Sequence, residues 1–161
     1  RATPAALGLL RCPWRWCLLG LALIVPFMLL TGGWVYLVEW LTGPQDEQDI
    51  VQTVRSSGSD LNVIAAMIYA IGIAPILEEI LFRGFLLGAI QRTWGANRAI
   101  LLSGFVFGIF HFSNPFTVVP LVIMGFCTGW LRIRSASIWP GWAMHIGFNS
   151  TSLALVVLAS G

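Results

Sequence analysis

Residues 61–90 read LNVIAAMIYAIGIAPILEEILFRGFLLGAI, an apolar run in which only Glu78, Glu79 and Arg83 carry charge. A membrane-spanning helix needs about 20 predominantly apolar residues, so this run is long enough to cross a bilayer. Pro75 lacks a backbone donor and disfavours helical geometry at the residue before it. The stretch therefore predicts a transmembrane helix with a kinked or re-entrant segment around Pro75 to Glu79.

The rest of the chain is also apolar: of its 161 residues, 57% are hydrophobic and only 10% are charged. This composition lies outside the usual range of soluble domains and indicates an integral membrane protein. Further spans are expected in the apolar runs at 17–41, where Pro26 should interrupt the helix, and at 99–112, 116–131 and 138–158. We therefore predict an all-α fold, a polytopic transmembrane helix bundle of about five spans.

Small residues favour close packing of these predicted helices. Glycines recur four residues apart in three consecutive segments, a spacing that lets helix backbones approach one another closely in a membrane. The pairs are Gly84 with Gly88, Gly104 with Gly108 and Gly125 with Gly129.

The chain divides into two parts by composition. The polar stretch Thr42–Asp60 is rich in acidic residues and is expected to form an extramembrane loop. We accordingly assign residues 1–60 to an N-terminal transmembrane helix with this acidic loop, and residues 61–161 to the helical core. Because the sequence begins with Arg1 rather than methionine, we expect further residues upstream.

All nine basic residues are arginines, and they are scattered at segment ends rather than clustered, so nothing indicates nucleic-acid binding. With five spans, most of them fall on one side of the membrane and the acidic loop falls on the other. The residues on the basic side are Arg1, Arg11, Arg15, Arg92, Arg98, Arg132 and Arg134. Cytoplasmic connections carry the excess of basic residues, so we expect a plasma or inner membrane protein with a cytoplasmic N-terminus.

Polar side chains lie inside three of the apolar runs. Glu78 lies in the run 61–90, His111 in the run 99–112, and His145 and Asn149 in the run 138–158. Ionisable groups at membrane depth are costly and usually face the protein interior, so they indicate a functional site. Counting about 1.5 Å per residue from the arginine-bearing ends places Glu78, His111 and Asn149 roughly 20 Å deep, and His145 roughly 6 Å shallower. These residues can therefore share one cavity.

Helical spacing assigns different roles to the two glutamates. Glu79 and Arg83 are four residues apart with the acid first, the favourable order for an intrahelical ion pair. Glu78 points about 100° away from that pair, so it is the carboxylate left free for chemistry. The same four-residue spacing places the ring of Phe107 beside His111.

Three motifs follow one another in the order EExxxR at Glu78–Arg83, FxxxH at Phe107–His111 and HxxxN at His145–Asn149. This ordered set, within hydrophobic segments, resembles the CPBP family, which comprises CAAX proteases and bacteriocin-processing enzymes and is also known as the Abi family. The resemblance covers roughly Leu61 to Leu158.

The resemblance implies an intramembrane glutamic endopeptidase, similar to the type II CAAX prenyl proteases, with a helical fold and no cofactor. By this resemblance Glu78 and His111 would activate water, whereas His145 and Asn149 would form the oxyanion hole. The residues expected to support the site are Glu79, Arg83 and Phe107. The partners would be membrane lipids and a membrane-associated or lipidated peptide or protein substrate.

Other functions stay open on the residues alone. One is a zinc-dependent intramembrane protease in which Glu78, His111 and His145 hold the metal and water takes the fourth position. The absence of HExxH and the presence of Asn149, a poor zinc ligand, favour the metal-independent mechanism. Another is a non-catalytic membrane binding or immunity protein, or a proton-coupled carrier, although no inverted repeat of the kind found in many carriers is evident. Serine and cysteine protease motifs are absent.

Overall fold

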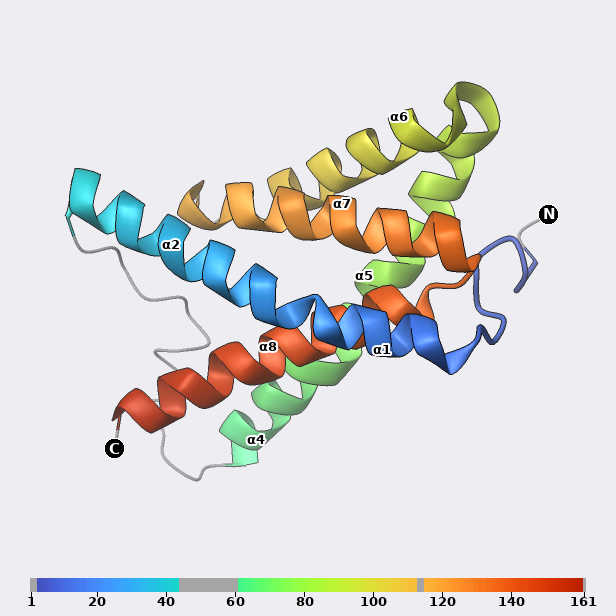
Figure 1. Cartoon of the computed structure of the whole chain (residues 1–161). Helices are drawn as coiled ribbons and strands as arrows, with labels where there is room; N and C mark the ends of the chain where they lie inside the picture. The colour runs from blue at the N-terminus through green and yellow to red at the C-terminus, as the bar shows by residue number, and fades with distance from the viewer. Residues whose placement is uncertain (1–2, 44–60, 113–114, 161) are drawn as a thin grey trace.

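The structure is a computed structural model that describes residues 3–43, 61–112 and 115–160. Within these ranges every regular element is a helix, and none is a strand. The helices are arranged as a bundle in which α6 and α7 lie side by side and α1 lies along α8 (Figure 1). The prediction of an all-α fold is confirmed. The acidic loop expected at 42–60 lies outside the described residues from position 44 onward.

The first apolar run forms two helices, α1 (Trp14–Ala22) and α2 (Ile24–Thr42). They meet at Leu23, which stays in the right-handed α region (φ -70°) but has a ψ of -12°, well above the usual helical value of about -42°. Pro26 has no N–H to donate to the carbonyl of Ala22, four residues earlier, so the helix is interrupted one turn before the proline. Pro26 does interrupt this helix, as predicted.

A segment of residues 3–10 precedes α1 and packs against the junction of α7 and α8. The backbone N–H of Ile138 donates to the carbonyl of Gly8 (2.9 Å), and the guanidinium of Arg132 donates to the carbonyl of Ala6 (3.1 Å). Leu7 contacts the second half of the apolar run 61–90, because a Cβ added at Gly84 would lie 2.9 Å from the Leu7 carbonyl oxygen. The N-terminal segment therefore joins the ends of several helices.

Residues 61–86 of the apolar run 61–90 are helical from the first residue, in four pieces that follow without a break. These are α4 (Leu61–Ile68), the π-helix η1 (Tyr69–Ile73), α5 (Ala74–Glu78) and the π-helix η2 (Glu79–Leu86). Ala74 keeps helical angles (φ -58°, ψ -50°) and its N–H bonds to the carbonyl of Tyr69, five residues earlier. Although Pro75 disfavours helical geometry at Ala74, that geometry is kept, because the wider π turn accommodates the proline. Such π turns are frequent at functional sites.

The chain then reverses within α6 (Leu87–Phe110), where Gly95 has a φ of 79° and a ψ of 173°. Essentially only glycine adopts this conformation without strain, so Gly95 is where the helical run turns back (Figure 1). The short 3-10 turn η3 (Pro115–Thr117) leads into α7 (Val118–Ser135), and α8 (Trp139–Ser160) ends the described chain.

Helices α6 and α7 pack backbone to backbone at Gly104 and Gly125. A Cβ added at Gly104 would lie 2.9 Å from the carbonyl carbon of Gly125, and one added at Gly125 would lie 2.8 Å from the carbonyl oxygen of Gly104. No larger residue fits at either position without separating the helices. The tight packing predicted from the glycine spacing is confirmed at this crossing.

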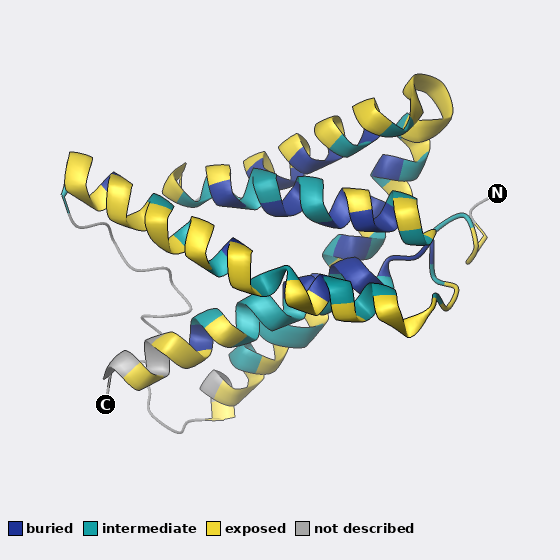
Figure 2. Ribbon diagram, in the orientation of Figure 1, coloured by how far each residue is buried: buried dark blue, intermediate teal, exposed yellow. Residues whose placement is uncertain are grey.

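Three helical stretches are long and apolar enough to cross a membrane: Trp14–Thr42, Ile64–Phe110 and Pro115–Ser135. Figure 2 shows exposed residues along the outward faces of α2 and α6, and many of these are large and apolar, as expected of a lipid-facing surface. The chain is a membrane protein. The turn at Gly95 divides the second stretch, and α8 is not among the three, so the count of about five spans stays a prediction.

The segments rich in arginine gather at one end of the bundle. The residues before α1, the turn near Gly95 and the end of α7 all lie at the right of Figure 1. This grouping agrees with the expected partition of charge. Which side of the membrane this end faces stays a prediction.

Candidate active site

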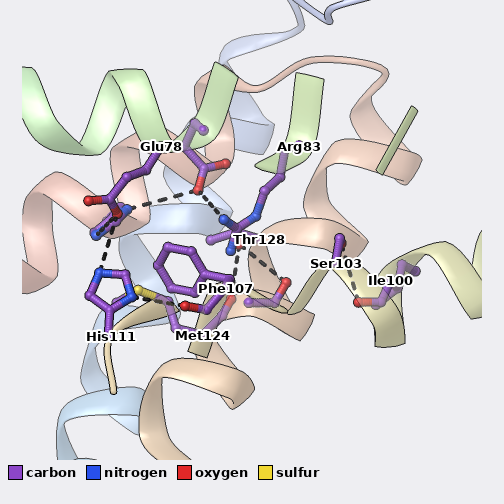
Figure 3. A network of polar contacts seen from close by, with 11 residues as sticks. Glu78, Arg83, Ile100, Ser103, Phe107, His111, Met124 and Thr128 are labelled. Carbon is purple, nitrogen blue, oxygen red and sulfur yellow. Dashed lines mark hydrogen bonds and ion pairs between the residues drawn. The ribbon is translucent and has the colours of Figure 1, made fainter. Parts of the chain in front are cut away.

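Three of the predicted site residues converge from three different elements near the middle of the bundle. Glu78 ends α5, His111 follows the last residue of α6, and His145 lies in the second turn of α8. The Nε2 atom of His111 is 3.8 Å from Oε2 of Glu78, and the Nε2 atom of His145 is 3.7 Å from the same oxygen. Figure 3 shows the side chains of Glu78 and His111 pointing toward each other. The structure thus brings these three groups together around one carboxylate oxygen.

These separations exceed the range of a direct hydrogen bond. Oε2 of Glu78 is buried and makes no hydrogen bond among the described residues, so it faces the two imidazoles without a direct bond to either. The side chains of Glu78 and His111 are 24% and 30% exposed, whereas that of His145 is only 5% exposed. The cluster is therefore reachable from one side and closed on the other.

Glu79 and Arg83 form an ion pair next to this cluster. Nη1 of Arg83 lies 3.4 Å from Oε1 of Glu79, and both side chains are completely buried. The predicted intrahelical pair is confirmed, even though it lies within the π-helix η2. A buried charge is tolerated only when it is paired, so each of the two groups depends on the other.

The ring of Phe107 packs against several members of the site. Its centroid lies 4.8 Å from that of His111 and 5.7 Å from that of His145, and the guanidinium carbon of Arg83 lies 4.2 Å from the Phe107 centroid. Figure 3 shows the ring beside His111 and Arg83. The expected contact with His111 is confirmed. The contacts with His145 and Arg83 come from other helices and had no signal in the sequence.

Asn149 lies one helical turn beyond His145, and its amide makes a different contact. Its Nδ2 donates a hydrogen bond of 2.8 Å to the carbonyl oxygen of Ala70, in the π-helix η1. Counting residues from the helix ends predicted that Asn149 lies at the same membrane depth as Glu78 and that His145 lies at a shallower depth. In the structure it is His145 that lies beside Glu78. Helices that tilt do not keep the depths obtained by counting residues from their ends, which accounts for the difference.

Gly141 is a site neighbour that the sequence reasoning missed. A Cβ at this position would lie 2.6 Å from Oε2 of Glu79 and 3.2 Å from the Cβ of Thr128. The absence of a side chain therefore makes room for the buried carboxylate. The spacing held a signal, because Gly141, His145 and Asn149 are each four residues apart and share one face of α8.

Among the described residues, no group of three or more His, Cys, Asp or Glu side chains has an arrangement that could hold a metal ion. The zinc alternative, with Glu78, His111 and His145 as ligands, stays a prediction that metal analysis must test.

Comparison with known proteins places the chain in a family. The family model described as Type II CAAX prenyl endopeptidase Rce1-like matches residues 60–151, a range that contains all three motifs. The Bacillus subtilis protein named "Putative membrane peptidase YdiL" is 31% identical over 102 residues. The aligned region covers 63% of this chain and 38% of that relative's length. No solved structure matches the chain. Because the family match extends over more than half of the residues, the chain belongs to the type II CAAX prenyl endopeptidase Rce1-like family.

Proposed function

We propose that this chain is an intramembrane endopeptidase that hydrolyses a peptide bond in a membrane-associated or lipidated protein substrate. The observation that carries the proposal is the approach of two imidazole Nε2 atoms, from His111 and His145, to within 3.8 Å of one oxygen of Glu78. A carboxylate and two imidazoles around one point can bind and deprotonate a water molecule. Membership of the Rce1-like family supports an endopeptidase activity.

In the proposed reaction Glu78, assisted by His111, takes a proton from the attacking water. The water oxygen bonds to the carbonyl carbon of the substrate, and the carbonyl oxygen becomes the oxyanion. His145 and Asn149 donate hydrogen bonds to that oxyanion. One amide hydrogen of Asn149 donates to Ala70, which leaves the second for the substrate.

The surroundings favour this chemistry on electrostatic grounds. Hydrogen-bond donors act more strongly on a developing negative charge in a water-excluded site than in bulk solvent. His145 is almost completely buried, and the Glu79–Arg83 pair beside it is fully buried. The proposed mechanism is metal-independent and needs no cofactor. The proposed location is a plasma or inner membrane, with the N-terminus in the cytoplasm.

The test is the substitution Glu78→Gln in purified, folded protein, assayed with a library of quenched peptides in proteoliposomes. Loss of a general base typically lowers the rate by about 10²–10⁴-fold, and that is the decrease expected here. Glu39→Gln is the matched control, because Glu39 is an exposed carboxylate on α2 and its substitution should leave the rate unchanged. Cleavage by Glu78→Gln at the wild-type rate would remove Glu78 as the base.

The same assay addresses the non-catalytic alternative. A binding or immunity protein would bind peptides without cleaving any of them, in the wild type as in the variant. The peptides that accumulate in membranes of cells expressing Glu78→Gln, relative to wild type, would identify the natural substrate class.

A further inference from the structure

The proton of His111 is located by its hydrogen-bond partner. Nδ1 of His111 lies 2.9 Å from the carbonyl oxygen of Phe107. A carbonyl oxygen only accepts, so Nδ1 must carry the hydrogen of the neutral imidazole. Nε2 of His111 therefore presents a lone pair toward Glu78.

The two nitrogens of His145 face two different carboxylates. Nε2 is 3.7 Å from Oε2 of Glu78, and Nδ1 is 3.9 Å from Oε1 of Glu79. Nδ1 is buried and makes no direct hydrogen bond among the described residues, so the Glu79 carboxylate is the charged group that it faces. A neutral imidazole has one hydrogen, so only one of the two carboxylates can face the nitrogen that bears it.

Glu79 is the more constrained of these two acids. Its Oε1 also faces Nη1 of Arg83 at 3.4 Å, and its Oε2 is held in the space left by Gly141. Oε2 of Glu78 is also buried, but it is shared between two imidazole nitrogens at similar distances and faces no cation so closely. An acceptor whose two oxygens are both held in place is better suited than one shared between two imidazoles to determine where the imidazole hydrogen lies.

We infer that Glu79 is a positioning residue that keeps the hydrogen of His145 on Nδ1, so that the Nε2 lone pair faces Glu78 and the attacking water. This inference rests on the proposed function, because it assigns a tautomer to a residue of that same site. Second groups that fix the tautomer of a functional histidine are common in enzymes and metal sites.

The consequence is that three acceptors meet in the resting site: the Glu78 carboxylate and the Nε2 atoms of His111 and His145. His145 can then donate to the oxyanion only after it has taken up a proton. That proton is the one lost by the water: it passes to Glu78 and on to Nε2 of His145, while the water oxygen bonds to the carbonyl carbon. When the tetrahedral intermediate collapses, the proton goes to the leaving nitrogen and the C–N bond breaks. The net reaction consumes one water and one peptide bond.

The chain contains only two histidines, so nuclear magnetic resonance can read both tautomers directly. We would label the chain with ¹³C,¹⁵N-histidine and record ¹⁵N and ring ¹³C shifts in micelles. A His111→Gln variant assigns the two signals. The expected result is a neutral imidazole with the hydrogen on Nδ1 for both residues. A hydrogen on Nε2 of His145, or a doubly protonated His145 in the resting protein, would overturn the inference without any variant.

A double variant tests whether Glu79 is the cause. Glu79→Met with Arg83→Met removes both members of the buried ion pair together, so neither charge is left unpaired. We expect the His145 hydrogen to move at least partly to Nε2, while His111 keeps its hydrogen on Nδ1 because its Phe107 partner is unchanged. Turnover should fall more than tenfold, with little change in KM. An unchanged His145 spectrum in a folded double variant would refute the role of Glu79.

The single variant Glu79→Gln adds a rescue. Glutamine keeps an oxygen that can accept from both Arg83 and Nδ1 of His145, so the tautomer and part of the turnover should be retained. A merely structural Glu79 would not link the His145 spectrum to turnover in this way. Failure of the proposed function would be seen separately, as full activity of Glu78→Gln whatever tautomer His145 adopts.

Discussion

The guanidinium carbon of Arg83 lies 4.2 Å from the centroid of the Phe107 ring, and both side chains are completely buried. A desolvated cation over an aromatic face gains about 2 kcal/mol or more. The same ring contacts both imidazoles of the candidate site. Phe107 therefore links the buried ion pair to the residues proposed to carry out the chemistry.

Phe107→Ala should destabilise the protein and lower its activity together. Truncating a buried phenylalanine costs about 3–5 kcal/mol, and the cation–π contact with Arg83 is lost as well. Thermal unfolding in detergent should show the decrease in stability, and the peptide assay should show a decrease in kcat. Phe105→Ala is the control, since Phe105 lies on the same helix but is 53% exposed. Its substitution should change neither the thermal stability nor kcat appreciably. Equal effects of the two substitutions would contradict the proposed role of Phe107.

Gly141→Ala should disturb the site through Glu79. The added Cβ would lie 2.6 Å from Oε2 of Glu79, so the carboxylate must move. A displacement of about 1 Å in a supporting group can cost up to about 10²-fold in rate, and we expect a decrease in kcat between tenfold and that value. Gly32→Ala is the matched control, because a Cβ there meets nothing within 4 Å. An active, normally folded Gly141→Ala enzyme would show that the position of Glu79 is not critical.

Arg132→Met should release the N-terminal segment. The buried Arg132 guanidinium donates to the carbonyl of Ala6, and hydrogen bonds to charged groups contribute about 1.5–3 kcal/mol. We expect a decrease in unfolding free energy of about 2 kcal/mol and faster limited proteolysis near residue 10. Arg134→Met removes the same charge from an exposed position on the same helix and serves as the control. Unaltered proteolysis in Arg132→Met would mean that other contacts hold the segment.

Chelation separates the glutamate mechanism from the zinc alternative. In the metal-independent mechanism, activity should persist in excess chelator, and elemental analysis of purified protein should find zinc well below one equivalent. Stoichiometric zinc, with activity lost in chelator and restored by zinc, would favour Glu78, His111 and His145 as metal ligands. Asn149→Ala in the same assay should then have little effect, because an amide is a poor zinc ligand.

Relations within one helix were predictable from the sequence, because helical periodicity decides which side chains are neighbours. The ion pair of Glu79 with Arg83 and the contact of Phe107 with His111 are of this kind, and both are present. The cost of ionisable groups in a membrane similarly indicated that Glu78, His111 and His145 would be gathered rather than face lipid.

Relations between helices were less predictable. Asn149 was expected at the same membrane depth as Glu78, but its amide donates a hydrogen bond to the carbonyl of Ala70. Residue counts along one helix do not give the tilt of that helix against its neighbours. Gly141 was not recognised as a neighbour of Glu79 for the same reason.

The sequence by itself determined that this protein is an all-helical membrane protein with three motifs of polar residues inside its apolar segments, since composition and local spacing are sufficient for both. Only the tertiary structure decided how those groups meet. The π turns beside Pro75, the reversal at Gly95 and the contact of Gly104 with Gly125 set the relative positions of the helices. Those positions in turn decide which nitrogen of each histidine faces which carboxylate, because that depends on distances between side chains of separate helices.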